Sequence, residues 1–155
     1  MKLKLIITTL SLMIVANCGY KVVNQNYLDK YAFTEITING DNRISYLLRN
    51  NLKRVNKEAA KNIKLDLTVN KTKSIKEKNI QNQITKYKID ITADVKYYII
   101  EENKSENFNV SKSGDYVVNK RYSTTLNNEK QLIKSLVNDI SEQIFTNLKI
   151  NLNEL

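Results

Sequence analysis

Few side chains in this sequence are of the kinds that perform catalysis or bind metals. The 155 residues include no histidine and a single cysteine, Cys18. Zinc sites of the Cys/His kind are therefore excluded, and so are the Ser-His and Cys-His pairs of hydrolases. With only three glycines, the sequence also lacks the glycine-rich loop that cradles phosphates. Carboxylates are the remaining candidates for acid–base chemistry.

The carboxylates with regular spacing are Asp66, Asp90 and Asp94, which alternate with lysines in stretches that read as strands. The lysines are Lys64, Lys88 and Lys96. Alternation places both charges on the polar face of a sheet, where an opposite-charge pair across two strands contributes about 0.2–1 kcal/mol. Such pairing explains the pattern without catalysis. We therefore expect no enzyme, no catalytic residue, no metal site and no cofactor.

Cys18 follows a segment typical of a bacterial signal peptide. Lys2 and Lys4 precede the apolar run 5–16, which is shorter than the roughly 20 residues of a transmembrane helix. The sequence Val15-Ala16-Asn17-Cys18 resembles a lipobox. This resemblance implies cleavage before Cys18, palmitate-type acylation of its thiol and acylation of the new amino terminus. Several acyl chains anchor a protein stably to a membrane.

Two letters of this motif differ from the usual lipobox pattern, Val15 in place of Leu and Asn17 in place of Gly or Ala. An ordinary cysteine after a non-lipoprotein signal peptide is therefore the alternative. Gly19 follows the cysteine, where Asp is the inner-membrane retention signal of Gram-negative bacteria. By resemblance to that sorting rule, we expect a lipid anchor in the outer membrane, with the domain facing the periplasm.

The net charge of +9 favours acidic partners. Nucleic acid, anionic lipid headgroups and phosphorylated glycolipids all fit it, and so does a solvated basic surface with no partner. We expect no nucleic acid, because an export signal directs the chain away from it and no aromatic-basic recognition motif is present.

Apolar periodicity predicts four strands and two helices. Alternation predicts strands at 33–38, 63–75 and 87–99, and a fourth strand made of 108–110 and 116–122 with an interruption at 113–115. Helical spacing of apolar residues predicts a helix from an N-cap at Asp41 or Asn42 to about Asn56. A second helix follows an N-cap at Asn127 or Asn128 and runs to about 148.

These elements predict an α+β two-layer sandwich, in which a roughly four-stranded, mostly antiparallel sheet carries two helices on one face. We expect a signal peptide at 1–17, a lipidated tether at 18–32 and a single domain at 33–155. The strand from residue 63 turns polar on its inward face beyond Val69, which predicts a hairpin that projects from the domain with a turn at 76–79.

Five stretches, in this order, resemble the lipopolysaccharide-assembly lipoprotein family LptE, formerly rare lipoprotein B (RlpB). They are Cys18-Gly19-Tyr20, the helix 43–52, the strand that opens with Thr85-Lys86-Tyr87-Lys88-Ile89, Lys120-Arg121-Tyr122-Ser123, and Asn128-Glu129-Lys130-Gln131-Leu132 with Asp139 and Gln143 downstream. The resemblance covers nearly all of 18–150.

The resemblance implies an outer-membrane lipoprotein that plugs the LptD β-barrel translocon. Members of the family help that barrel assemble and bind lipopolysaccharide on its way to the outer leaflet. For this chain, Lys71, Lys73, Lys76 and Lys78 near the hairpin tip are the candidate ligands of lipid A phosphates. A solvated lysine cluster is the alternative for these four residues. The alternative for the whole chain is a free-standing outer-membrane lipoprotein that binds an anionic ligand.

Overall fold

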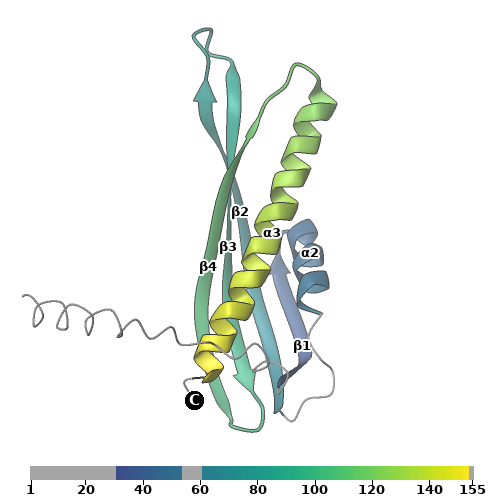
Figure 1. The fold of residues 1–155 in the computed structure, drawn as a ribbon, viewed down its shortest axis with the longest axis vertical. Helices are drawn as coiled ribbons and strands as arrows, with labels where there is room; N and C mark the ends of the chain where they lie inside the picture. Colours follow the sequence, from purple (N-terminus) through teal and green to yellow (C-terminus); the bar gives the residue numbers. More distant parts are fainter. Residues whose placement is uncertain (1–30, 54–60, 154–155) are drawn as a thin grey trace, which may run out of the picture.

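The computed structural model describes residues 31–53 and 61–153. Along the chain, the elements are β1 (Tyr31–Gly40), α2 (Asn42–Leu52), β2 (Lys61–Lys78), β3 (Ile84–Ile99), β4 (Lys104–Val117) and α3 (Tyr122–Asn153). The strands form one sheet in the order β1-β2-β3-β4, with β1 and β2 parallel and the other pairs antiparallel. Both helices lie on one face of this sheet (Figure 1). The predicted α+β fold is confirmed.

The core lies between the sheet and the helices and is built from alternate residues of the central strands. On β3 the buried residues occupy every second position from Ile89 to Ile99, and on β2 they do so from Ile63 to Val69. Helix α3 contributes a stripe at helical spacing that runs from Ile133 to Leu152. Burial of each large aliphatic side chain contributes about 1.5–3 kcal/mol. The alternate residues of the strands and the helical stripe of α3 therefore pack against each other in one core.

Helix α2 begins where the sequence predicts, because Asp41 caps it. The Asp41 side chain accepts hydrogen bonds from the backbone N–H groups of Arg43 and Ile44, both at 3.1 Å. Burial alone would raise the pKa of Asp41, but Lys71 and the two N–H groups hold it below its ordinary value. The helix ends at Leu52 with Lys53 as its C-cap, so the predicted end at about Asn56 is too late.

Gly40 connects β1 to this cap and must be glycine for two reasons. Its φ is +117°, a backbone conformation that other residues rarely adopt, and a Cβ atom there would lie 1.9 Å from the carbonyl oxygen of Val69. The backbones of β1 and β2 thus approach each other more closely than a side chain allows.

Strand β4 is continuous, so the predicted interruption at 113–115 is wrong. Gly114 pairs with Ile89 within the regular register. A Cβ atom at Gly114 would lie 2.7 Å from Cδ1 of Leu132 on α3. The glycine therefore lets the helix approach the sheet, and it marks no turn.

Strand β4 ends at Val117 and helix α3 begins at Tyr122, so the predicted strand end at 122 and the predicted N-cap at Asn127 or Asn128 are also wrong. Thr125 is buried, and its Oγ1 accepts from the backbone N–H of Asn119 at 2.8 Å. The polar run that reads as a loop instead supplies the first turns of the helix, where short polar side chains bond to nearby backbone.

The hairpin of β2 and β3 projects past the N-terminal end of α3 (Figure 1). Its turn lies at 79–83, later than predicted, because β2 continues to Lys78. The Asn79 side chain accepts hydrogen bonds from the backbone N–H groups of Gln81 and Gln83, and Asn82 adopts a φ of 61°. At about 3.3 Å per residue, the 18 residues of β2 extend over roughly 60 Å.

We predict that Gly40→Ala destabilises the domain by at least about 2 kcal/mol, because it combines a disfavoured φ with a clash against rigid backbone. Gly114→Ala is the matched control, since its Cβ meets the end of a flexible leucine side chain. Urea unfolding monitored by circular dichroism measures both losses. An equal or larger loss for Gly114→Ala would contradict the strain assigned to Gly40.

Candidate functional site

The first two of the four candidate lysines lie on the helix side of the sheet and are paired. Lys71 Nζ lies 2.9 Å from Asp41 Oδ2, the cap of α2, and Lys73 Nζ lies 2.9 Å from Glu129 Oε2 on α3. Both ion pairs therefore link the emerging hairpin to the helical layer. The inward face of β2 turns polar here because these lysines replace apolar packing with links to the helices.

Lys73 occupies an aromatic recess. Its Nζ lies 4.4 Å from the ring centre of Tyr87 and 5.3 Å from that of Tyr116. The Tyr116 hydroxyl donates to Glu129 Oε2 at 2.8 Å. Burial alone would lower the pKa of Lys73 and raise that of Glu129, but their hydrogen bonds to each other and to Tyr116 shift both pKa values the opposite way. The charged pair is thus favoured in the fold.

Lys76 and Lys78 lie farther along the hairpin. Lys76 forms an ion pair with Asp115 on β4, and Lys78 Nζ donates to Asn82 Oδ1 at 2.9 Å. Lys76 retains about half of its side-chain exposure, 48%. The structure therefore separates the four residues into an inner pair held by the helices and an outer pair near the turn. Their role in binding lipopolysaccharide stays a prediction.

Among the described residues, no helix lies on the second face of the sheet, and this face is polar over most of its length, with Tyr98 and Val117 as exceptions. The alternation that buries one side chain exposes the next, and the residues on this face are short and polar or charged. They include Lys64, Asp66, Thr68, Asn70, Thr92, Asp94, Lys96, Asn107, Asn109, Ser111 and Ser113. We call this surface the open sheet face.

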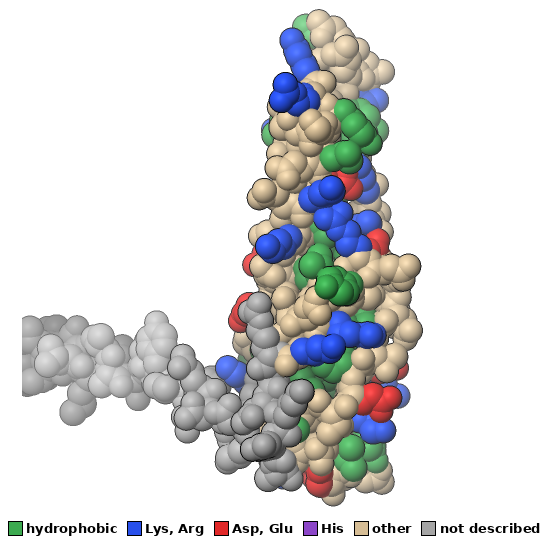
Figure 2. All heavy atoms as spheres, turned by 90° about the vertical axis from the view of Figure 1, so that its right-hand side faces the viewer, with side chains coloured by type: hydrophobic (Ala, Val, Ile, Leu, Met, Phe, Trp, Pro, Cys, Tyr) green, Lys and Arg blue, Asp and Glu red, His purple; other side chains and the backbone are tan. Residues whose placement is uncertain are grey.

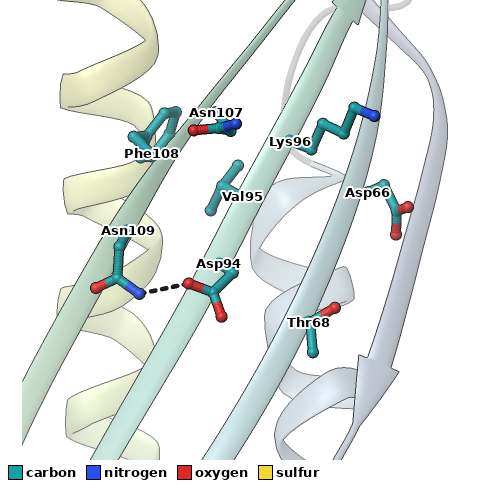
Figure 3. A pocket seen from close by; sticks show the side chains of 8 residues that line it. All are labelled: Asp66, Thr68, Asp94, Val95, Lys96, Asn107, Phe108 and Asn109. Atoms are coloured by element: carbon teal, nitrogen blue, oxygen red, sulfur yellow. Dashed lines mark hydrogen bonds between the residues drawn. The ribbon is translucent and has the colours of Figure 1, made fainter.

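A shallow hollow of about 430 Å³ lies on the open sheet face. Figure 3 shows its side chains on three neighbouring strands, with Asn109 Nδ2 donating to Asp94 Oδ1 at 2.6 Å. Asp66 lies opposite Lys96 in the register of β2 and β3. The three predicted carboxylates thus sit on one polar face beside cations or amides, as the alternation predicts.

A second hollow, about 460 Å³ in volume, lies between the two helices. It is lined by Arg43 and Leu47 of α2 and by Lys130, Gln131, Lys134, Ser135 and Asn138 of α3. We call it the helix groove. Arg43 lies outside the buried stripe of α2, and no pattern in the sequence associates it with Lys130 and Lys134. The available signal in the sequence was the four-residue spacing of Lys130 and Lys134, which places both lysines on one side of α3.

Across 31–53 and 61–153, no group of three or more Asp, Glu, Cys or His side chains is arranged to hold a metal ion. Within the same ranges, neither helix is both long enough and apolar enough to cross a bilayer. Cys18, the signal peptide and most of the predicted tether lie outside the described residues. Lipidation of Cys18 stays a prediction.

Comparison with known proteins gives matches among solved structures. Rare lipoprotein B from Shewanella oneidensis superposes with a TM-score of 0.56 at 13% identity, covering 77% of this chain and 98% of that one. This chain has the rare lipoprotein B fold. A putative lipoprotein from Caulobacter crescentus gives a TM-score of 0.61 at 17% identity, with 82% and 93% of the two chains covered. A minor lipoprotein from Acinetobacter baumannii gives a TM-score of 0.54 at 11% identity, with 79% of this chain and 92% of that chain covered.

No family model and no curated protein matches the sequence. The rare lipoprotein B fold is therefore visible in the arrangement of elements, whereas the identities are too low to carry single residues across. The fold matches what the ordered motifs of the sequence imply.

We predict that Glu129→Gln destabilises the domain by about 1–2 kcal/mol at pH 7, because it leaves Lys73 without its carboxylate. The pKa of Glu129 is lowered in the folded state. Its contribution is therefore fully present above its ordinary pKa of 4.5 and is lost as the pH falls through the lower, folded value. Measured by urea unfolding, the difference in free energy of unfolding between Glu129→Gln and wild type should be smaller at about pH 3 than at pH 7.

Asp139→Asn is the control for this prediction, because Asp139 is an exposed carboxylate on the same helix. It should change stability by less than about 0.5 kcal/mol at either pH. A pH-independent loss in Glu129→Gln would contradict the ionic origin of the effect.

Proposed function

We propose that this chain belongs to the LptE family and is an outer-membrane lipoprotein that plugs an LptD-type β-barrel, helps it assemble and binds lipopolysaccharide during its transport to the outer leaflet. The proposal rests mainly on the open sheet face, a long polar surface that the domain leaves uncovered. The shared fold with rare lipoprotein B supports it.

The chemistry of the open sheet face suits the inside of a large barrel. Interiors of outer-membrane barrels are polar, with water-filled or plugged lumens. Hydroxyl, amide and carboxylate groups such as those of Thr68, Asp94 and Asn109 offer donors and acceptors to a polar wall. They expose little apolar surface of the kind that would drive aggregation before a partner is met.

The length of the domain also suits a plug. Strand β2 has 18 residues and extends over roughly 60 Å, about twice the 30 Å of a bilayer's hydrocarbon core. A domain of this shape reaches through the membrane depth of a barrel while its other end stays in the periplasm.

The hairpin offers apolar contacts to a partner. Ile80 in the turn is fully exposed, at 100%, and Ile75 on β2 and Val117 on β4 are about half exposed. Exposed aliphatic side chains near one end of a soluble domain mark a contact surface. Lipopolysaccharide phosphates would meet the hairpin through Lys76 and Lys78, the two candidate lysines nearest the turn, with a phosphate replacing Asp115 as the partner of Lys76. Lys71 and Lys73 are held farther from the turn by Asp41 and Glu129.

Anchoring through Cys18 holds the domain near the bilayer. The twelve residues between Cys18 and Tyr31 reach at most about 45 Å when fully extended. We propose no catalysis, in keeping with the lack of histidine in the sequence. The second candidate function is a free-standing lipoprotein that binds an anionic ligand, and the cations of the helix groove favour it.

We predict that Cys18→Ala abolishes incorporation of radiolabelled palmitate in cells and that wild-type chain takes up the label and fractionates with the outer membrane. The physical reason is that Cys18 carries the only thiol in the sequence available for acylation. Label retained by Cys18→Ala, or a wild-type chain recovered from the soluble periplasm, would contradict the anchor.

We predict that affinity-tagged chain, purified from detergent-solubilised outer membranes, retains a large β-barrel protein. The double variant Thr68→Arg with Ser111→Arg places two bulky charges on the open sheet face and should lower recovery of the barrel at least about tenfold, as expected for buried unpaired charges at an interface. Both positions are exposed, so the domain should stay folded.

The matched control is Asn50→Arg with Asn127→Arg, which adds the same charge on exposed positions of the helices. This control variant should recover nearly as much of the barrel protein as wild type does. Recovery of folded wild-type chain with no barrel would support the free-standing module, and equal losses in both double variants would contradict the role of the open sheet face.

A further inference from the structure

The cations of this domain are divided between two environments. Eight lysines form ion pairs with carboxylates, and all eight belong to strands: Lys61, Lys64, Lys71, Lys73, Lys76, Lys86, Lys88 and Lys104. The five basic residues within the helices have no carboxylate of the described residues at ion-pair distance: Arg43, Arg49, Lys130, Lys134 and Lys149. Three strand lysines, Lys78, Lys96 and Lys112, also lack such a pair, so the helical layer differs from the sheet in that none of its basic residues is paired among the described residues.

Three of these cations meet in the helix groove. Arg43 comes from α2, and Lys130 and Lys134 lie one turn apart on α3; no carboxylate lines the groove. Like charges four residues apart destabilise a helix, so this arrangement is unfavourable unless an anion offsets it. Figure 2 shows Lys and Arg side chains outnumbering Asp and Glu along the side of the molecule where α2 lies in Figure 1.

The groove is held open by fixed contacts between the helices. Asn51 Nδ2 donates to Asn138 Oδ1 at 3.0 Å and to Ser141 Oγ at 3.1 Å, which sets the spacing of α2 and α3. The groove therefore belongs to the folded domain, and the helices that carry its cations are held in place before any ligand arrives.

The groove has the chemistry of a surface that meets phosphodiesters at an interface. A guanidinium and two ammonium groups suit phosphate oxygens, and Gln131, Ser135 and Asn138 add neutral donors. Leu47 gives an apolar patch, and Tyr46 beside it is 67% exposed. Basic residues with an aromatic side chain on an amphipathic helix are typical of contact with an anionic membrane.

We propose that the helix groove docks the domain onto a bilayer surface that contains anionic glycerophospholipids of the phosphatidylglycerol class. This proposal rests on the proposed function in one respect, since the anchor at Cys18 would keep the groove within reach of such a surface. The open sheet face lies on the other side of the sheet from the helices. Docking through the helices therefore leaves the open sheet face uncovered until the chain enters its barrel, whose lumen would then enclose the helix groove as well.

The test uses the chain from residue 19 onward, without leader or lipid attachment site. Every buried hydrophobic side chain of the described residues lies between Tyr31 and Leu152, so this chain keeps the whole core. It should co-sediment with vesicles of phosphatidylglycerol and phosphatidylcholine in equal parts, and not with pure phosphatidylcholine vesicles. Because no anchor is present, failure here is distinct from failure of Cys18 lipidation.

The triple variant Arg43→Gln, Lys130→Gln and Lys134→Gln should lower partitioning onto the phosphatidylglycerol vesicles at least about tenfold, since each basic residue near an anionic surface contributes about fivefold. Lys64→Gln, Lys86→Gln and Lys88→Gln form the control, which removes the same charge from paired lysines of the sheet. It should lower partitioning less than about threefold. Circular dichroism confirms the fold of each variant.

Three outcomes would overturn the proposal. The first is no binding by wild type, and the second is an equal loss in both triple variants, which would reduce the effect to net charge. The third is release from the vesicles by about 10 mM inorganic phosphate at constant ionic strength, which would identify a site for a single phosphate in place of a membrane surface.

Discussion

The packing of α3 against the inner face of β3 and β4 sets the rest of this structure. Alternate residues of the strands and a helical stripe from Ile133 to Leu152 bury each other, and Gly114 lets the helix approach closely at Leu132. Because most apolar residues of the strands are directed to this one side, the other side of the sheet is left mainly polar. The open sheet face is thus a direct consequence of where the core lies.

How far the sequence predicts this structure depends on how local each cause is. The strand at 87–99 and the Asp41 cap arise from neighbouring residues, and both are confirmed. Gly114 misleads as a turn signal because its reason is Leu132, 18 residues later. The partner of Lys73 is Glu129, 56 residues away. No local pattern distinguishes such a paired lysine from a solvated one, so the four candidate lysines could be located but their environments could not.

The distribution of charge connects the two surfaces of the domain. Most lysines of the sheet form ion pairs with carboxylates across neighbouring strands or on the helices, so the open sheet face is polar and nearly compensated. The helices expose cations without such partners around the helix groove. A compensated polar face suits a polar protein wall, and an uncompensated basic face suits an anionic surface.

The central claim is that the open sheet face contacts the inside of an outer-membrane barrel, and site-specific photo-cross-linking in living cells tests it most directly. A photoreactive residue at Thr92, in the middle of that face, should form an adduct with a large β-barrel protein, at lumen-facing positions of its strands. The same photoreactive residue in place of Asn50, on α2, is the comparison position on the helix side of the sheet. An adduct with the barrel at Thr92 is the result the account predicts; no adduct at Thr92, with the barrel present in the same membranes, would contradict it.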